Sequence, residues 1–292
     1  MTRPFKKHAT TLALFLITAL LPACSGQKSD PEALRLFDQA KALSESSDRA
    51  DNERATLLFD TLHKAFPNEL KLRKEAIYLA RQLRLRMSEA DSVTFAGQYA
   101  KDSALLMQMD PLFVRDKYPG MSDEETLMRY KGYKPTDTPG KLFLDVYLRH
   151  DASIEIVAGH AGNGVSPITS LVVSDPETGD FAASDTIPAS DTGRNYSFKA
   201  DGITRHRLTL SREASARIAA FIALKHREGR PVSVELLNNG KKAAAFALTA
   251  LQKETTAETY RFYAAYVEMK TLEEQQQRHA LYRNRLRTTP NS

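Results

Sequence analysis

Four side chains in the middle of the chain have types and spacing that could bind a ligand: Tyr147, His150, His160 and Asn163. They lie around a glycine-rich segment, residues 159–164, where glycine permits a close approach of the backbone to a phosphate or a sugar. His150 and His160 could also meet across paired strands and hold a metal ion. The segment lacks the glycine order of a dinucleotide-binding motif, and no Lys-Ser or Lys-Thr pair follows it. The pattern therefore favours a plain connection between strands, with a ligand-binding loop as the alternative.

Aromatic residues in or beside the same region offer a second route to ligand binding. They are Tyr130, Tyr133, Tyr147, Tyr196 and Phe198. Exposed rings in a row stack on sugars, although aromatic residues on strands more often pack in the core or against a neighbouring strand. Both interpretations stay open from the sequence.

Signatures of catalysis are missing from the sequence. It contains no G-x-S-x-G motif and no H-E-x-x-H motif, and no spacing links a serine and a histidine to a carboxylate. We therefore predict no enzymatic reaction, no cofactor and no resident metal.

The single cysteine, Cys24, lies at the end of an N-terminal leader. Basic residues precede an uncharged apolar run, Thr11 to Leu21, which is too short to span a membrane as a mature helix. The run ends in Leu21-Pro22-Ala23-Cys24, which resembles the lipobox of bacterial lipoproteins. That resemblance implies a diacylglycerol on the Cys24 sulfur and cleavage after Ala23. One cysteine also excludes a disulfide within the chain.

The charge of the chain changes when the leader is removed. The formal net charge is +5 for 292 residues, and the leader carries three positive charges and no negative one, so the mature chain has +2. A nearly neutral chain without a clustered basic face gives no reason to expect nucleic-acid binding. We expect the lipid to be the attachment to the membrane.

Hydrophobic periodicity divides the mature chain into helical and β-rich parts. The expected fold is α+β, a helical hairpin or stalk built from N- and C-terminal helices, with an inserted antiparallel β-sheet or sandwich that carries one helix. The expected segments are a signal peptide (1–23), a tether (24–30), a helical region (31–110), a connector (111–140), a β-rich domain (141–252), a long C-terminal helix packing on the N-terminal helices (253–287) and a tail (288–292).

Local signals refine this outline. Two separate helices are expected over 69–87 and 92–109, and a capping box of Ser122 and Glu125 predicts a short helix over 123–130. Ser211 is expected to cap the helix of the β-rich domain. Asn238-Asn239-Gly240 between two apolar runs predicts a β-hairpin.

One modification is also predicted. Asp185-Thr186-Ile187 resembles the O-glycosylation sequon of periplasmic and surface proteins of Bacteroidota, and Thr186 precedes a proline in a loop-rich part of the chain. We therefore expect Thr186 to be a glycosylation site.

The whole layout resembles uncharacterised lipoproteins of Bacteroidota. The resemblance rests on the lipobox, the helix Leu58 to Pro67, the string 218–223 before 231–236 and the long C-terminal helix. It implies a lipid-anchored cell-envelope protein. The long helices and the missing catalytic signature favour a non-catalytic interaction or scaffold protein that presents its β domain to an envelope protein partner. The alternative is a lipoprotein that binds a carbohydrate or small ligand through the β domain. Ser25 after the cysteine favours the outer membrane, and the single acidic residue among 25–30 favours its periplasmic face.

Overall fold

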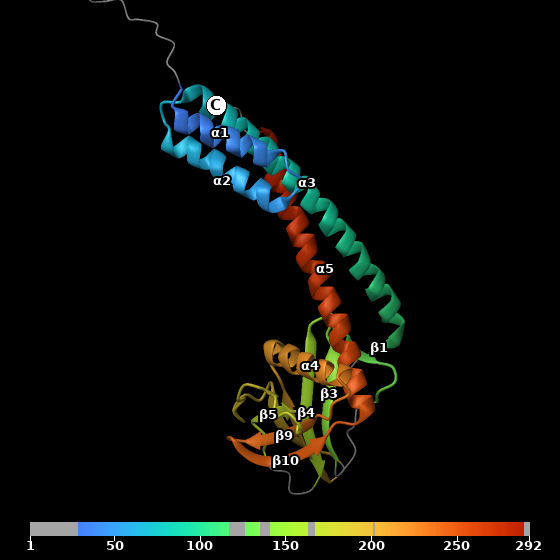
Figure 1. Cartoon of the computed structure of the whole chain (residues 1–292). Coiled ribbons are helices and arrows are strands. Elements are labelled where there is room, and N and C mark those ends of the chain that lie inside the picture. The colour runs from blue at the N-terminus through green and yellow to red at the C-terminus, as the bar shows by residue number, and fades with distance from the viewer. Residues whose placement is uncertain (1–28, 117–125, 135–140, 163–166, 201, 289–292) are drawn as a thin grey trace, which may run out of the picture. The chain divides into compact units, whose positions relative to one another are not determined.

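The computed structural model describes residues 29–116, 126–134, 141–162, 167–200 and 202–288 (Figure 1). The leader with Cys24, most of the tether, Asn163 and most of the tail lie outside these ranges. The chain divides into two compact units, one made of residues up to Ala90 together with Tyr282 onward, the other of Asp91–Leu281. None of the described helices is both long enough and apolar enough to cross a membrane.

The first unit is helical. It contains α1 (Pro31–Ser44), α2 (Arg49–Ala65), the first half of α3 (Leu70–Met109) and the last residues of α5 (Ala250–Thr288). Aspartates cap two of these helices, since Asp30 accepts a hydrogen bond from the Glu32 N–H at 2.8 Å and Asp48 one from the Ala50 N–H at 2.6 Å.

A separate hydrophobic core holds the helices of the first unit together. Phe37 and Phe59 meet edge to face with ring centroids 6.1 Å apart. Around them pack small and aliphatic side chains, namely Ala33, Ala40, Ala55, Leu62, Ala76, Ala80 and Leu83. On α3, Arg84 donates to both carboxylate oxygens of Asp60 at 2.7 and 2.6 Å, which joins α3 to α2.

The helix α3 corrects one expectation. The two helices predicted over 69–87 and 92–109 are one continuous helix. The residues between them include no proline and no glycine, so nothing in the backbone chemistry ends the helix there.

Two arginines of α5 contact this stretch of α3. Arg283 donates a hydrogen bond to the Ser88 carbonyl at 3.2 Å, and Arg287 donates one to Glu89 at 2.9 Å.

The second unit contains two antiparallel sheets. The order of the first is β1 (Phe113–Asp116), β2 (Leu127–Tyr130), β3 (Lys141–Leu148), β4 (Ile154–Gly162), β8 (Ile203–Thr209) and β7 (Asn195–Ala200). The order of the second is β10 (Lys241–Ala247), β9 (Ser233–Asn238), β5 (Ser170–Ser174) and β6 (Phe181–Ala183). The fold is therefore α+β, with N- and C-terminal helices flanking an antiparallel β region, as predicted.

One core joins both sheets to α4 (Arg212–Arg227) and to α5. Its fully buried members include Ile156, Leu171, Leu208, Ile218, Ile222 and Leu236. The helix α4 packs against β4, β5 and β6 (Figure 1). The predicted cap is confirmed, because the Ser211 hydroxyl accepts a hydrogen bond from the Ala214 N–H at 3.2 Å. The predicted hairpin is confirmed as β9–β10, whose turn residues Asn239 and Gly240 have φ of 48° and 78°.

The sheet begins earlier in the chain than predicted. After a short 3₁₀ turn (Asp110–Leu112), β1 and β2 pair with each other, and β2 adds them to β3 through Met128 opposite Leu148. The helix expected over 123–130 is wrong, since its described end is strand β2. Met128 and Phe113 are buried in the common core, and that burial outweighs the local capping signal. The segment expected to be a connector thus supplies two strands of this sheet, β1 at its edge and β2 beside it.

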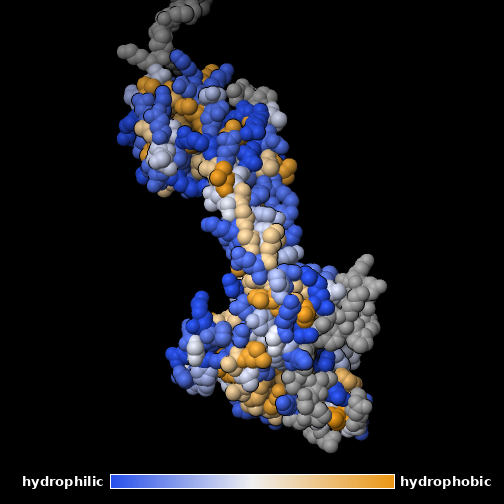
Figure 2. Space-filling view, turned by 90° about the vertical axis from the view of Figure 1, so that its right-hand side faces the viewer, coloured by the Kyte–Doolittle hydropathy of each residue, from blue (hydrophilic) through white to orange (hydrophobic). Residues whose placement is uncertain are grey.

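Hydrophilic residues cover most of the visible surface in the space-filling view, with hydrophobic residues scattered among them (Figure 2). Scattered apolar side chains are ordinary on a protein surface. Single exposed hydrophobic residues therefore do not indicate a binding surface, whereas those that occur in pairs or at a sheet edge can do so.

Candidate functional site

The side chains predicted to form one ligand site are not brought together. Tyr147 pairs with Glu155 near one end of the β3–β4 hairpin, and His150 lies in the turn at that end. His160 pairs with Leu142 near the other end. His160 lies six positions along β4 from Ile154, a distance of roughly 20 Å. The two histidines therefore do not approach each other, and Asn163 lies outside the described residues.

The glycine-rich segment is a strand over its described part, which corrects the expected loop. Residues 159–162 belong to β4. Gly159 lies opposite Phe143 in the register, and a Cβ there would come within 2.5 Å of the Phe143 ring and 2.1 Å of the His206 carbonyl oxygen. Glycine at 159 is thus required by packing between strands.

The Tyr147 hydroxyl is engaged in a buried polar group. Asp145 is 3% exposed and accepts hydrogen bonds from Tyr133 at 2.7 Å and from Tyr147 at 3.3 Å. The Tyr133 carbonyl in turn accepts a hydrogen bond from Arg129 at 2.8 Å. This network fixes the strand β3 to the chain after β2. Asp145 was not singled out from the sequence, because there it is one polar residue among the alternating residues of a strand.

A second buried group centres on His206, opposite His160 on β8. The Ile168 N–H lies 3.0 Å from its Nε2, the Ile168 carbonyl oxygen lies 3.2 Å from the same nitrogen, and Nδ1 lies 2.5 Å from the Ser197 hydroxyl. Burial lowers the pKa of His206, and nearby His160 adds to that shift, against the opposing contact with the Ile168 backbone. His206 therefore joins β7 and β8 to the segment that leads into β5.

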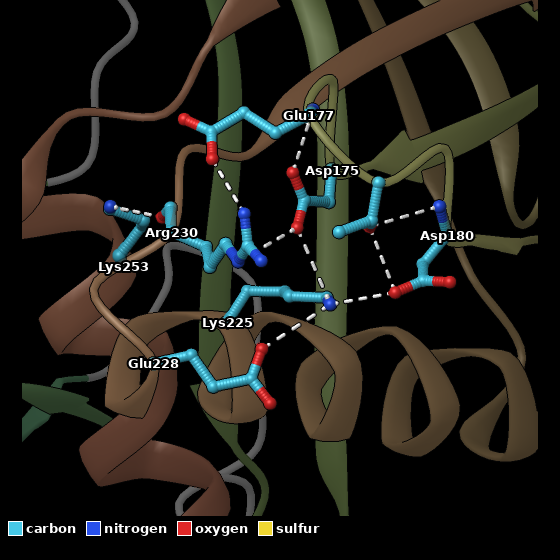
Figure 3. Close-up of polar contacts among 8 residues, drawn as sticks. Asp175, Glu177, Asp180, Lys225, Glu228, Arg230 and Lys253 are labelled. Carbon is cyan, nitrogen blue, oxygen red and sulfur yellow. Dashed lines mark hydrogen bonds and ion pairs between the residues drawn. The ribbon is translucent and has the colours of Figure 1, made fainter.

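An ionic network ties the C-terminal end of α4 to the β5–β6 turn (Figure 3). The Lys225 side chain is 5% exposed, and its ammonium lies 2.9 Å from Asp180, 3.3 Å from Glu228 and 3.4 Å from Asp175. Arg230 extends the network to Glu177 at 2.6 Å. Each acidic group therefore has a cationic neighbour.

The charges of this network stabilise one another. The hydrogen bond to Asp180 is the largest contribution that raises the pKa of Lys225 to about 12, against the opposing effect of burial. Burial acts to raise the pKa of Asp175, but hydrogen bonds from the Glu177 and Thr178 backbone, the Thr178 hydroxyl and Lys225 lower it overall. A lysine that is held charged cannot act as a base near neutral pH. We assign this network to the stability of the fold.

The most distinctive exposed feature is an aromatic pair on β7. Tyr196 and Phe198 stack with ring centroids 6.1 Å apart and an interplanar angle of 25°, and they are 37% and 39% exposed. They occupy the same face of the strand two residues apart. The Arg205 guanidinium lies over the Phe198 ring, 6.0 Å from its centroid, from the register position opposite on β8.

The strand that carries this pair ends its sheet. Among the described strands, β7 pairs with β8 alone. The Thr209 N–H donates to the Arg194 carbonyl at 2.7 Å, so even-numbered residues of β7 turn their backbone groups toward β8. Ser197 and Lys199 therefore turn theirs toward the open edge. We define the β7 edge as Tyr196, Ser197, Phe198, Lys199 and Arg205.

Thr186 lies between β6 and β7 and is exposed. The neighbouring Ile187 N–H donates to the Thr169 carbonyl at 2.7 Å, and Asp185 lies 3.8 Å from Arg217. The glycosylation of Thr186 stays a prediction. Among the described residues, no three His, Cys, Asp or Glu side chains group closely enough to hold a metal ion.

The comparisons with known proteins add no relative. No family model, no curated protein and no solved structure matches the chain.

Proposed function

We propose that this protein is a lipid-anchored, non-catalytic interaction protein of the cell envelope that binds a protein partner by strand addition at the β7 edge. The observation that carries the proposal is the stacked Tyr196–Phe198 pair beside outward-facing backbone groups on a terminal strand. A terminal strand offers main-chain hydrogen bonds to an extended segment, and side-chain pockets supply the selectivity. Tyrosine and arginine are also the residues that most often dominate protein interfaces.

The anchor in this proposal is Cys24, with the outer membrane as its location and the periplasmic face as its side. The support is the lipobox-like Leu21-Pro22-Ala23-Cys24 after the apolar run. Several acyl chains hold a protein far more firmly than one. Metabolic labelling with an alkyne fatty acid should mark the wild-type protein and not Cys24→Ser. An unlabelled wild-type protein would overturn the anchor without bearing on the β7 edge.

The strand-addition proposal is tested at Lys199. Lys199→Pro removes one outward N–H while leaving the inward hydrogen bonds to β8 intact, because proline is tolerated on the open side of an edge strand. Lys199→Ala is the matched control, since it removes the same side chain and keeps the N–H. Partner affinity should fall by at least about fivefold in the proline variant relative to the alanine variant. Equal affinities would contradict strand addition.

A carbohydrate ligand is the second candidate, and the stacked pair itself favours it. Sugar rings stack on exposed aromatic faces and do not need the Lys199 N–H. A glycan array would then retain its signal with Lys199→Pro and lose it with Tyr196→Ser combined with Phe198→Ser. The two candidates therefore give opposite results for the proline variant.

A further inference from the structure

A cleft of about 570 Å³ lies between α3, α4 and α5, entirely within the second unit. Its volume is in the range of small-molecule sites. Small side chains make room for it, namely Ala220, Ala223, Ala257, Ala264 and Ala265. Leu105 and Tyr260 add an apolar wall. The cleft is separate from the β7 edge and does not depend on the function proposed for that edge.

A buried carboxylate, Asp102, lines the cleft from α3. The residue is 6% exposed, and its Oδ1 accepts a hydrogen bond from the Gln98 amide at 3.0 Å. Its Oδ2 is buried, and no described residue donates a hydrogen bond to it. A buried carboxylate oxygen without a donor is unfavourable, so native proteins nearly always supply one. A donor brought by a ligand would satisfy this oxygen.

The remaining charged groups of the cleft favour a cation. Glu258 lies 3.5 Å from Arg261, which offsets its charge. Glu268 contributes a further carboxylate and Arg227 a further guanidinium, both exposed. The two carboxylates Glu258 and Glu268 and the two guanidiniums Arg227 and Arg261 cancel in formal charge, so Asp102 leaves one negative charge in excess at the buried side. An ammonium group is the complementary partner, because it donates hydrogen bonds and carries the opposite charge.

We propose that this cleft binds a primary ammonium group on a short apolar stem, with the ammonium at Asp102 and the stem along Leu105 and Tyr260. The same chemistry occurs in a free alkylamine and in the lysine side chain of a polypeptide. A neutral alcohol of the same length has the stem without the charge, so it does not satisfy the site.

The test measures binding to the full chain in detergent by isothermal titration calorimetry. The probes are n-butylammonium chloride, 1-butanol and the blocked tripeptide acetyl-Ala-Lys-Ala-amide. Butylammonium should bind and butanol should not. Asp102→Asn should weaken butylammonium binding by at least about tenfold, the usual consequence of losing a hydrogen bond to a charged group. Tighter binding of the tripeptide assigns the site to polypeptide lysines, and binding of butylammonium alone assigns it to free amines.

Two further variants keep the proposal falsifiable. Ala223→Leu fills the cleft and leaves Asp102 in place, so it should abolish binding while circular dichroism shows a folded protein. Glu75→Gln removes one exposed carboxylate from the same helix in the first unit and should leave binding unchanged. No binding of either amine to the wild-type protein, equal binding of butanol, or an unaffected Asp102→Asn variant would each overturn the proposal.

Discussion

Gly159→Ala is the substitution whose effect follows most directly from the geometry. The new methyl group would lie 2.1 Å from the His206 carbonyl oxygen and 2.5 Å from the Phe143 ring. The phenylalanine ring can turn away, but the carbonyl belongs to the backbone of β8. Strands β4 and β8 therefore have to separate, and the cross-strand pairing around residue 159 is lost with them.

The magnitude follows from the size of this overlap. Forcing one extra methylene into a packed interior costs typically 1–3 kcal/mol, and a backbone clash belongs at the upper end. We expect Gly159→Ala to lower the free energy of unfolding of the second unit by about 3 kcal/mol. For a unit of this size, the melting temperature should then fall by roughly 6–12 °C.

Gly97→Ala is the matched control in the same unit. No heavy atom lies within 4 Å of its added Cβ, and residue 97 is inside helix α3. Alanine there should raise stability by about 0.8–1.0 kcal/mol through helix propensity alone. Differential scanning calorimetry, with hydrogen exchange at the β8 amides, measures both variants. A loss below about 1 kcal/mol for Gly159→Ala would refute the packing argument and return the segment to the ligand-loop interpretation.

Three further predictions follow from the buried groups and the exposed threonine. Lys225→Met should destabilise the protein, and the difference in free energy of unfolding between wild type and variant should narrow in acid. The hydrogen bond from Lys225 is the main cause that lowers the pKa of Asp180, so the stability from this pair is lost as the pH falls below the usual carboxyl range. A difference in urea unfolding that does not depend on pH would contradict this. The pKa of His206 is lowered in the folded protein, so the unfolded chain binds the proton first and the free energy of unfolding falls on acidification through pH 6.5. The difference in free energy of unfolding between wild type and His206→Gln should therefore shrink in acid. A difference that stays constant with pH would refute this. Thr186 should carry added mass in intact-mass spectra of native material, and an unmodified wild-type mass would end that prediction.

Sequence patterns predicted the features whose causes are local. The Ser211 cap and the turn at Asn239-Gly240 depend on residues within a few positions, and both are confirmed. Hydrophobic periodicity likewise divided the chain into helical and β-rich parts. Fold class followed from these periodicities, since helices and strands each bury one pattern of side chains.

Features that depend on distant partners were not predictable in this way. Gly159 looked like part of a loop because its partners, Phe143 and His206, lie far from it in sequence. Strand β2 lies within a segment with a local capping box, and its pairing with β1 and β3 makes it a strand. Tyr196 was noted as aromatic, but its position on a terminal strand depends on strand order. The sequence does not mark Asp102 as a ligand-binding residue, since its burial arises from the packing of three helices.

Strand addition places a segment of the protein partner along the β7 edge, beside Tyr196. The most direct measurement is photo-crosslinking in cells from a benzophenone amino acid at position 196, in the Lys199→Ala and Lys199→Pro backgrounds. A benzophenone at Phe181, which is 68% exposed on the other sheet, controls for random contact. We expect one protein adduct from position 196 with Lys199→Ala, its loss with Lys199→Pro, and no such adduct from position 181. An adduct of equal yield in both backgrounds, or none from position 196, would contradict it.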